Sequence, residues 1–210
     1  MVARICGICP VAYQVTAAQA LEKLFGVELD PWARDMRRVF YCGEWIQSHS
    51  LHIHLLAAPD FFGCDNAIEL AKIAPEEVRR GLRIQALGNE LMELFGARSV
   101  HPVGIRVGGF HGAPALSRVE GIRGKLRAAL PGAEALIRWA AGIAVPQDDQ
   151  AFVSVAMRHA RDYAIEAGAI AASDGLLIEP EAYGEHFAEQ QQAHSTALFS
   201  SYHGQPYLVG

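Results

Sequence analysis

Two cysteines near the amino end constrain the architecture of this chain more than any other feature. Cys6 and Cys9 lie in the run R-I-C-G-I-C-P, with Arg4 two residues before the first thiol and a helix-like stretch directly after Pro10. A C-x-x-C loop brings two sulfurs within reach of one soft metal ion, and free amides at a helix start favour thiolates. The run therefore predicts a thiolate site at a helix N-terminus.

Three kinds of site are compatible with this pair in principle. A thioredoxin-like oxidoreductase places C-x-x-C after a strand of a parallel sheet, but only five residues precede Cys6. A zinc site takes two further Cys or His ligands at short spacing, and the remaining cysteines, Cys42 and Cys64, are isolated. The third possibility is half of a four-thiolate site for nickel, iron or an iron–sulfur cluster, with its other cysteine pair far along the chain or missing.

The first two-thirds of the chain are expected to be mainly helical. Apolar spacing and cap residues predict helices over residues 10–25, 31–58, 75–95 and from 117 onward. Gly26 supplies a stop for the first helix, and Asp30 before a proline reads as the N-cap of the second. A capping box at Ser117 and Glu120 starts the last helix, which Pro131 should kink or divide.

After about residue 150 the pattern changes to short apolar runs separated by turn residues. We expect strands over residues 152–157, 163–165, 167–172 and 176–178, a short helix near 180–190, and a final hairpin of 198–202 with 207–209. The predicted fold class is α+β, a mainly helical bundle with a small antiparallel β part toward the C-terminus. Residues 1–147 are mainly helical and 148–210 mixed α/β, and we expect one compact unit.

Composition restricts the class of protein further. With 51% hydrophobic and 20% charged residues over 210 positions, the chain has enough apolar material for a sizeable core. A net charge of -5 without a basic cluster argues against a nucleic-acid partner. Charged residues interrupt the longest apolar stretch, 126–146, so we expect no membrane span. Four cysteines without regular pairing favour a reducing compartment, the cytoplasm.

Several separated motifs together resemble one family. The run R-I-C-G-I-C-P resembles the N-terminal metal-binding motif of nickel-iron hydrogenase large (alpha) subunits, most of all the cytoplasmic branch, sulfhydrogenases and NAD(P)- or F420-linked enzymes. Further segments resemble that family in the expected order: residues 43–54, 56–60, 96–102, 108–110, 194–195 and 207–210. The resemblance therefore extends over essentially the whole chain.

The resemblance implies a metal centre and partner subunits. Cys6 matches the terminal nickel thiolate, and Cys9 matches the thiolate that bridges nickel and iron, whose iron also carries CO and CN ligands. The implied reaction is the reversible heterolytic cleavage of H2, with electrons passed to a small iron–sulfur subunit, and electron-acceptor subunits are the further implied partners. Tyr13 stands where many members have a histidine near the bridging sulfur, and a tyrosine hydroxyl also donates hydrogen bonds.

Family members are longer than this chain, and their C-terminus carries a second pair of cysteines in the pattern Asp-Pro-Cys-x-x-Cys-x-x-His. We therefore expect a fragment of the catalytic subunit with an incomplete ligand set, inactive by itself. The alternatives are a non-catalytic scaffold or assembly relative, and a free C-x-x-C redox or zinc module.

Other candidate residues have simpler interpretations. His49 and His52 lie three apart on one helical face, a spacing that suits a metal, but a core or interface histidine with a satisfied hydrogen bond is favoured. Cys42 and Cys64 are expected to be small buried side chains. His101 resembles a family position near the site, and a structural hydrogen bond is an equally good explanation for it.

Overall fold

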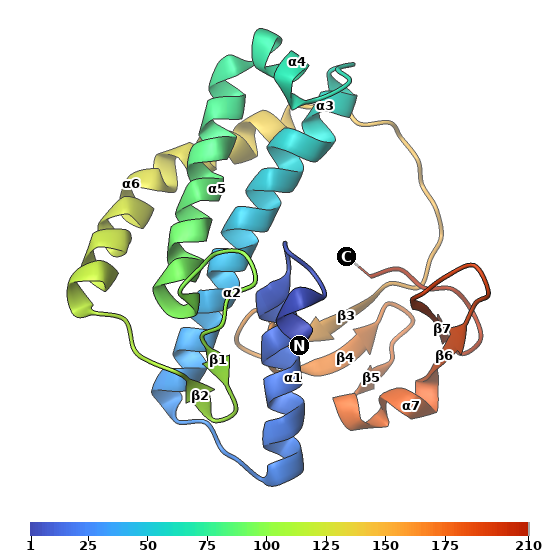
Figure 1. Cartoon of the computed structure of the whole chain (residues 1–210). Coiled ribbons are helices and arrows are strands. Elements are labelled where there is room, and N and C mark those ends of the chain that lie inside the picture. The colour runs from blue at the N-terminus through green and yellow to red at the C-terminus, as the bar shows by residue number, and fades with distance from the viewer. Residues whose placement is uncertain (210) are drawn as a thin grey trace. The chain divides into compact units, whose positions relative to one another are not determined.

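The computed structural model describes residues 1–209, so Gly210, the end of the segment 207–210, lies outside the described residues. Contacts divide the chain into two compact units, Met1–Pro146 and Gln147–Gly210, where the sequence had suggested one. Residues 144–153 have no regular secondary structure. The first unit is helical and the second carries most of the strands (Figure 1).

The helices of the first unit follow the sequence closely. They are η1 (Val2–Arg4), α1 (Pro10–Phe25), α2 (Pro31–Leu51), the π-helical η2 (His52–Ala57), α3 (Ala58–Phe61), α4 (Ala67–Ile73), α5 (Pro75–Gly96) and α6 (Leu116–Ala141). Gly26 ends α1 in the left-handed conformation, with φ 64°, as its position predicts. The Asp30 side chain accepts a hydrogen bond from the Ala33 amide at 2.8 Å and caps α2.

The core of this unit is formed by α2 and α5, which pack against each other with α6 beside α5 (Figure 1). Its buried apolar side chains include Val11, Val15, Phe40, Leu91, Met92, Phe95 and Phe110. A Cβ atom added at Gly88 would lie 2.4 Å from the backbone nitrogen of Gln47. The two long helices can approach this closely because position 88 has no side chain.

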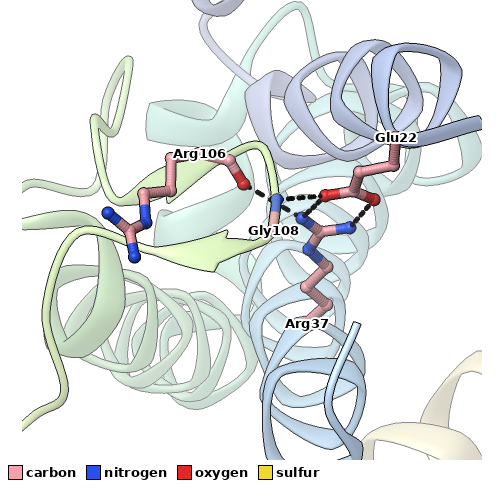
Figure 2. Close-up of polar contacts among 4 residues, drawn as sticks. All are labelled: Glu22, Arg37, Arg106 and Gly108. Carbon is pink, nitrogen blue, oxygen red and sulfur yellow. Dashed lines mark hydrogen bonds and ion pairs between the residues drawn. The ribbon is translucent and has the colours of Figure 1, made fainter. Parts of the chain in front are cut away.

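A buried ion pair joins α1 and α2 to a short hairpin of β1 (Ile105–Arg106) and β2 (Gly109–Phe110). Figure 2 shows the Arg37 guanidinium donating to both carboxylate oxygens of Glu22, at 2.8 and 2.6 Å. The Gly108 amide also donates to Glu22, and Arg37 donates to the Arg106 carbonyl. These bonds fix three segments that are far apart in the sequence around one charge pair.

Three details of the first unit differ from the sequence-based expectation. The cap of α6 is Ala115, without a side-chain hydrogen bond, so the capping box at Ser117 was wrong. Pro131 does not divide the helix, which continues to Ala141, and whether the helix is kinked there stays a prediction. The expected single helix over 31–58 is interrupted by η2.

The second unit contains two small antiparallel sheets, which confirms the α+β class. One sheet has β3 (Val155–Arg158), β4 (Ala169–Ala172) and β5 (Leu177–Ile178), and the other pairs β6 (Phe187–Gln191) with β7 (Leu198–Tyr202). Between them lie η3 (Pro180–Ala182) and α7 (Tyr183–His186). Val155, Phe187 and Tyr202 form the buried cluster of this unit.

The strand predictions were only partly right. Residues 163–165 form no strand, and β7 pairs with β6 rather than with 207–209. The expected helix over 180–190 ends at His186, because Phe187 is buried opposite Tyr202 across the β6–β7 pair. None of the helices in the described part of the chain is long and apolar enough to cross a membrane.

Candidate metal centre

The cysteine loop lies between η1 and the start of α1. Cys9 is the residue that precedes the first turn of α1, and Pro10, the first helical residue, is fully buried. Both Cys6 and Cys9 are free and partly exposed. The buried proline and the helix anchor the loop, while the two sulfur atoms remain accessible.

Hydrogen bonds to its sulfur favour the thiolate form of Cys6. Its Sγ accepts from the backbone amides of Ile8 at 3.3 Å and Cys9 at 3.2 Å. Burial raises the pKa of Cys6, but hydrogen bonds from the Cys9 thiol and from these two amides outweigh it, so the pKa lies below its ordinary value.

Cys9 is the protonated partner of this pair. Burial, the hydrogen bond to Cys6 and the negative charges of Cys6 and Glu44 raise the pKa of Cys9 to about 11. Of the two thiols, Cys6 is therefore the first to lose its proton, and the Cys9 thiol donates its hydrogen bond to the Cys6 sulfur. Two soft donors at one place fit half of a four-thiolate nickel site.

A buried carboxylate supports the first turn of α1 from the neighbouring helix. Glu44 on α2 is 3% exposed, and its two oxygens accept hydrogen bonds from the amides of Val11 at 2.6 Å and Ala12 at 3.3 Å. Because Cys9 makes no side-chain cap bond, Glu44 takes over the capping role. Burial outweighs these two bonds and raises the pKa of Glu44 to about 7.

His101 lies on the other side of the cysteine loop. Its Nδ1 is 2.5 Å from the Ala3 carbonyl, so Nδ1 carries the proton and donates. A Cβ atom at Gly7 would lie 3.9 Å from the imidazole Cε1 of His101. His101 has φ 49°, and Arg98 donates to its carbonyl at 2.7 Å. His101 therefore makes a structural hydrogen bond and also lies beside the cysteine loop, so the two interpretations of this residue are compatible.

The other candidates from the sequence do not join the cysteine pair. His49 and His52 are exposed, and the His49 imidazole hydrogen-bonds to the Trp45 carbonyl at 2.8 Å. Cys42 and Cys64 are partly exposed, less buried than expected. Within residues 1–209, no group of three or more His, Cys, Asp or Glu side chains is arranged to hold a metal ion.

Glu44 was not predicted from the sequence to be a site residue. It lies on the buried stripe of α2 with Ala33, Arg37 and Phe40, at helical spacing. A buried carboxylate needs a hydrogen-bond or charge partner, and this need was the signal in the sequence that could have identified Glu44. Nothing local showed that the partners would be amides of α1.

Known proteins share the sequence around the cysteine loop. Residues 1–82, which include both cysteines and Glu44, match the family model described as nickel-dependent hydrogenase. This part of the chain is that of a nickel-dependent hydrogenase. The resemblance inferred from the motifs is thereby confirmed, and the matched relatives are large-subunit proteins.

Two hydrogenase relatives match nearly the whole of this chain, which corresponds to about half of each of them. The alpha subunits of sulfhydrogenase 1 and sulfhydrogenase 2 of Pyrococcus furiosus are each 32% identical over 209 residues, 99% of this chain and 49% and 48% of those proteins. An F420-non-reducing hydrogenase protein of Methanothermobacter marburgensis is 37% identical over 117 residues, 52% of this chain and 25% of that protein. The chain spans about half the length of the curated relatives that match its full extent.

Solved hydrogenase structures share the fold. An NAD+-reducing [NiFe]-hydrogenase in the H2-reduced state superposes with a TM-score of 0.78 and 26% identity, covering 96% of this chain and 49% of that one. The Ni-Fe-Se hydrogenase from D. vulgaris Hildenborough gives a TM-score of 0.75 at 19% identity, over 98% of this chain and 53% of that one. The architecture is that of a hydrogenase large subunit.

Proposed function

We propose that this chain supplies two thiolates of a Ni–Fe centre, Cys6 as a terminal nickel ligand and Cys9 as the ligand that bridges nickel and iron. The observation that carries the proposal is the pair of free, partly exposed thiols at the start of α1, in which Cys9 donates a hydrogen bond to the Cys6 sulfur. Within residues 1–209 no larger group of metal-binding side chains surrounds the pair, so the proposal assigns these two ligands alone. The chain alone does not turn over hydrogen.

The thiol protonation pattern suits ordered metal loading. Cys6 has the lower pKa and is the first sulfur available as a thiolate, whereas Cys9 must lose its proton when the metal binds. Metal binding therefore releases a proton from the pair. Hydrogen bonds from the amides of Ile8 and Cys9 hold the Cys6 sulfur in place before the metal arrives.

A Ni–Fe centre whose iron carries CO and CN ligands supplies the reversible heterolytic cleavage of H2 when it is bound. Cys6 and Cys9 would hold the centre, and Glu44 supports the helix start beside them. Glu44 holds the first turn of α1 through Val11 and Ala12, and with a pKa of about 7 its carboxyl group can keep or release a proton near neutral pH.

The partners we propose are a small iron–sulfur subunit that receives the electrons and further electron-acceptor subunits. The relatives support this because the two sulfhydrogenase proteins are named as alpha subunits. We place the protein in the cytoplasm, since four cysteines without regular pairing in the sequence are typical of a reducing compartment. The net charge of -5 supports partners other than nucleic acid.

The proposal is tested by titrating the 210-residue chain with Ni(II) under anaerobic, reducing conditions. We expect a thiolate-to-nickel charge-transfer absorption that is lost in both Cys6→Ser and Cys9→Ser. The matched control is Cys42→Ser, which should keep the band. A band that survives both loop substitutions would overturn the ligand assignment. Stoichiometric zinc held in preference to nickel and lost in the same variants would instead support the zinc-module alternative.

A further inference from the structure

Two histidines meet in the second unit of the chain, outside the cysteine site. His186 is the last residue of α7, directly before β6, and His203 directly follows β7. The Nδ1 atom of His186 and the Nε2 atom of His203 are 3.2 Å apart. The function proposed above uses neither residue.

The separation of these two nitrogens matches that of two ligands on one metal ion. Imidazole nitrogens lie about 2.0–2.1 Å from zinc, so two of them on a tetrahedral ion are about 3.3 Å apart. The rings of His186 and His203 are not stacked, because their planes cross at 79° and their centroids are 5.1 Å apart. In the structure these two nitrogens share a hydrogen bond, one donating and the other accepting, and an ion that binds both would take the place of the shared proton.

The backbone holds the two side chains in this register. Phe187 pairs with Tyr202 across the β6–β7 ladder, and the His203 amide donates to the His186 carbonyl at 3.0 Å. The side chains of Phe187 and Tyr202 are each 5% exposed, so the hairpin is anchored in the core of its unit. A site formed on paired, buried strand ends loses little conformational entropy when it binds an ion.

The surroundings favour a cation that arrives from solvent. His203 is exposed and His186 is partly exposed. The Asp174 carboxylate accepts a hydrogen bond from the Tyr202 hydroxyl at 2.8 Å and interacts electrostatically with His203. A nearby carboxylate offsets part of the charge of a bound divalent ion.

We propose that His186 and His203 bind a divalent transition-metal ion of the Ni(II), Cu(II) and Zn(II) class, with water completing its coordination. Imidazole nitrogens suit these ions, whereas Mg(II) and Ca(II) prefer oxygen ligands. No third His, Cys, Asp or Glu joins the two histidines in the described part of the chain. The ion is therefore held less tightly than in a structural zinc site and exchanges with solvent.

The test is a Ni(II) titration of the full 210-residue chain by calorimetry, in a Cys6→Ser and Cys9→Ser background that removes the thiolate site. We expect one Ni(II) per chain. Either His186→Gln or His203→Gln should weaken binding by more than about tenfold, since even the loss of an outer-shell partner costs 10–100-fold at metal sites. The matched control is His194→Gln, in the loop at the other end of the same hairpin, which should leave the affinity unchanged.

A second readout keeps the test independent of folding effects. In the background chain, paramagnetic Ni(II) should broaden the ring signals of His186 and His203 in a histidine NMR spectrum before those of His194. Failure of the background chain to bind Ni(II), binding by either glutamine variant that equals that of the background chain, or an equal loss of affinity in the His194→Gln control would each overturn the proposal. Because the background lacks both thiolates, these outcomes are separate from a failure of the function proposed for Cys6 and Cys9.

Discussion

The carboxylate of Glu44 on α2 accepts a 2.6 Å hydrogen bond from the backbone amide of Val11, in the first turn of α1. The bond links the helix that follows the cysteine loop to the central helix of the first unit. Because Val11 is only two residues after Cys9, the position of the Cys9 thiol depends on a side chain more than thirty residues away in the sequence. Glu44 is therefore a positioning residue for the candidate site.

Removing this carboxylate should destabilise the chain. In Glu44→Ala the amides of Val11 and Ala12 lose their acceptors, and an unsatisfied buried group costs about 1–3 kcal/mol. Glu44→Gln keeps one acceptor oxygen and should lose less of the free energy of unfolding. Urea denaturation of the two variants checks this order. Equal stability of parent and Glu44→Ala would show that water or another group satisfies the amides.

The raised pKa of Glu44 predicts a specific pH dependence of stability. In the folded chain this pKa is about 7, above the ordinary value of 4.5, so the folded state binds more protons than the unfolded state between these two values. The Glu44 contribution to stability is therefore fully present below about pH 4.5 and is lost as the pH rises through about 7.

The difference in unfolding free energy between parent and Glu44→Gln isolates this contribution. That difference should shrink from about pH 5 to about pH 8. His54, whose pKa is lowered by burial, has the opposite slope in an overlapping range, but its contribution cancels because both proteins contain it. A difference that stays constant or grows with pH would contradict the protonation assigned to Glu44.

The two thiols should differ in reactivity. Cys6 has a lowered pKa and Cys9 a pKa of about 11, so iodoacetamide should modify Cys6 first at about pH 8. In Cys6→Ala the hydrogen bond and the charge that raise the pKa of Cys9 are gone, and Cys9 should react faster than in the parent. Peptide mass spectrometry measures both rates. If Cys9 were modified faster than Cys6 in the parent, the assignment of the lower pKa to Cys6 would be wrong.

The ion pair of Glu22 and Arg37 should contribute far more to stability than a surface pair. Their side chains are 6% and 2% exposed, and Glu22→Gln leaves a buried guanidinium charge without its counter-ion, a change that costs about 3–5 kcal/mol. The matched control is the exposed pair of Glu90 and Lys125, where Glu90→Gln should change stability by less than about 1 kcal/mol. Similar losses of unfolding free energy in Glu22→Gln and Glu90→Gln would contradict the expected difference between the buried pair and the exposed pair.

Local signals explain which parts of the fold could be predicted from the sequence. Gly26 and Asp30 mark helix ends through their own backbone and side-chain preferences, so α1 and the start of α2 were predicted correctly. The partner of β7 was missed because strand pairing is decided by distant residues, here Phe187 opposite Tyr202. Ser117 failed as a cap because α6 already begins at the preceding residue.

The difference between local sequence signals and contacts between separate segments also applies to the candidate site. Cys6 and Cys9 were evident because their chemistry and spacing lie within four consecutive residues. The contributions of Glu44 and His101 depend on α2 and on the loop after α5 reaching the cysteine loop, which no local pattern encodes. The sequence could identify the proposed ligands, whereas the groups that orient them required the tertiary structure.

The central claim is that the Cys6 and Cys9 sulfurs are ligands of one nickel ion. X-ray absorption spectroscopy tests it most directly, because it counts the sulfur atoms bound to the metal; parent and variants are all measured in a His186→Gln background with one nickel per chain, so that the histidine pair does not contribute. We predict two sulfur ligands in the parent and in Cys42→Ser, and one in Cys6→Ser and in Cys9→Ser. A first shell of nitrogen and oxygen in the parent, or a sulfur count unchanged by either substitution, would contradict the account.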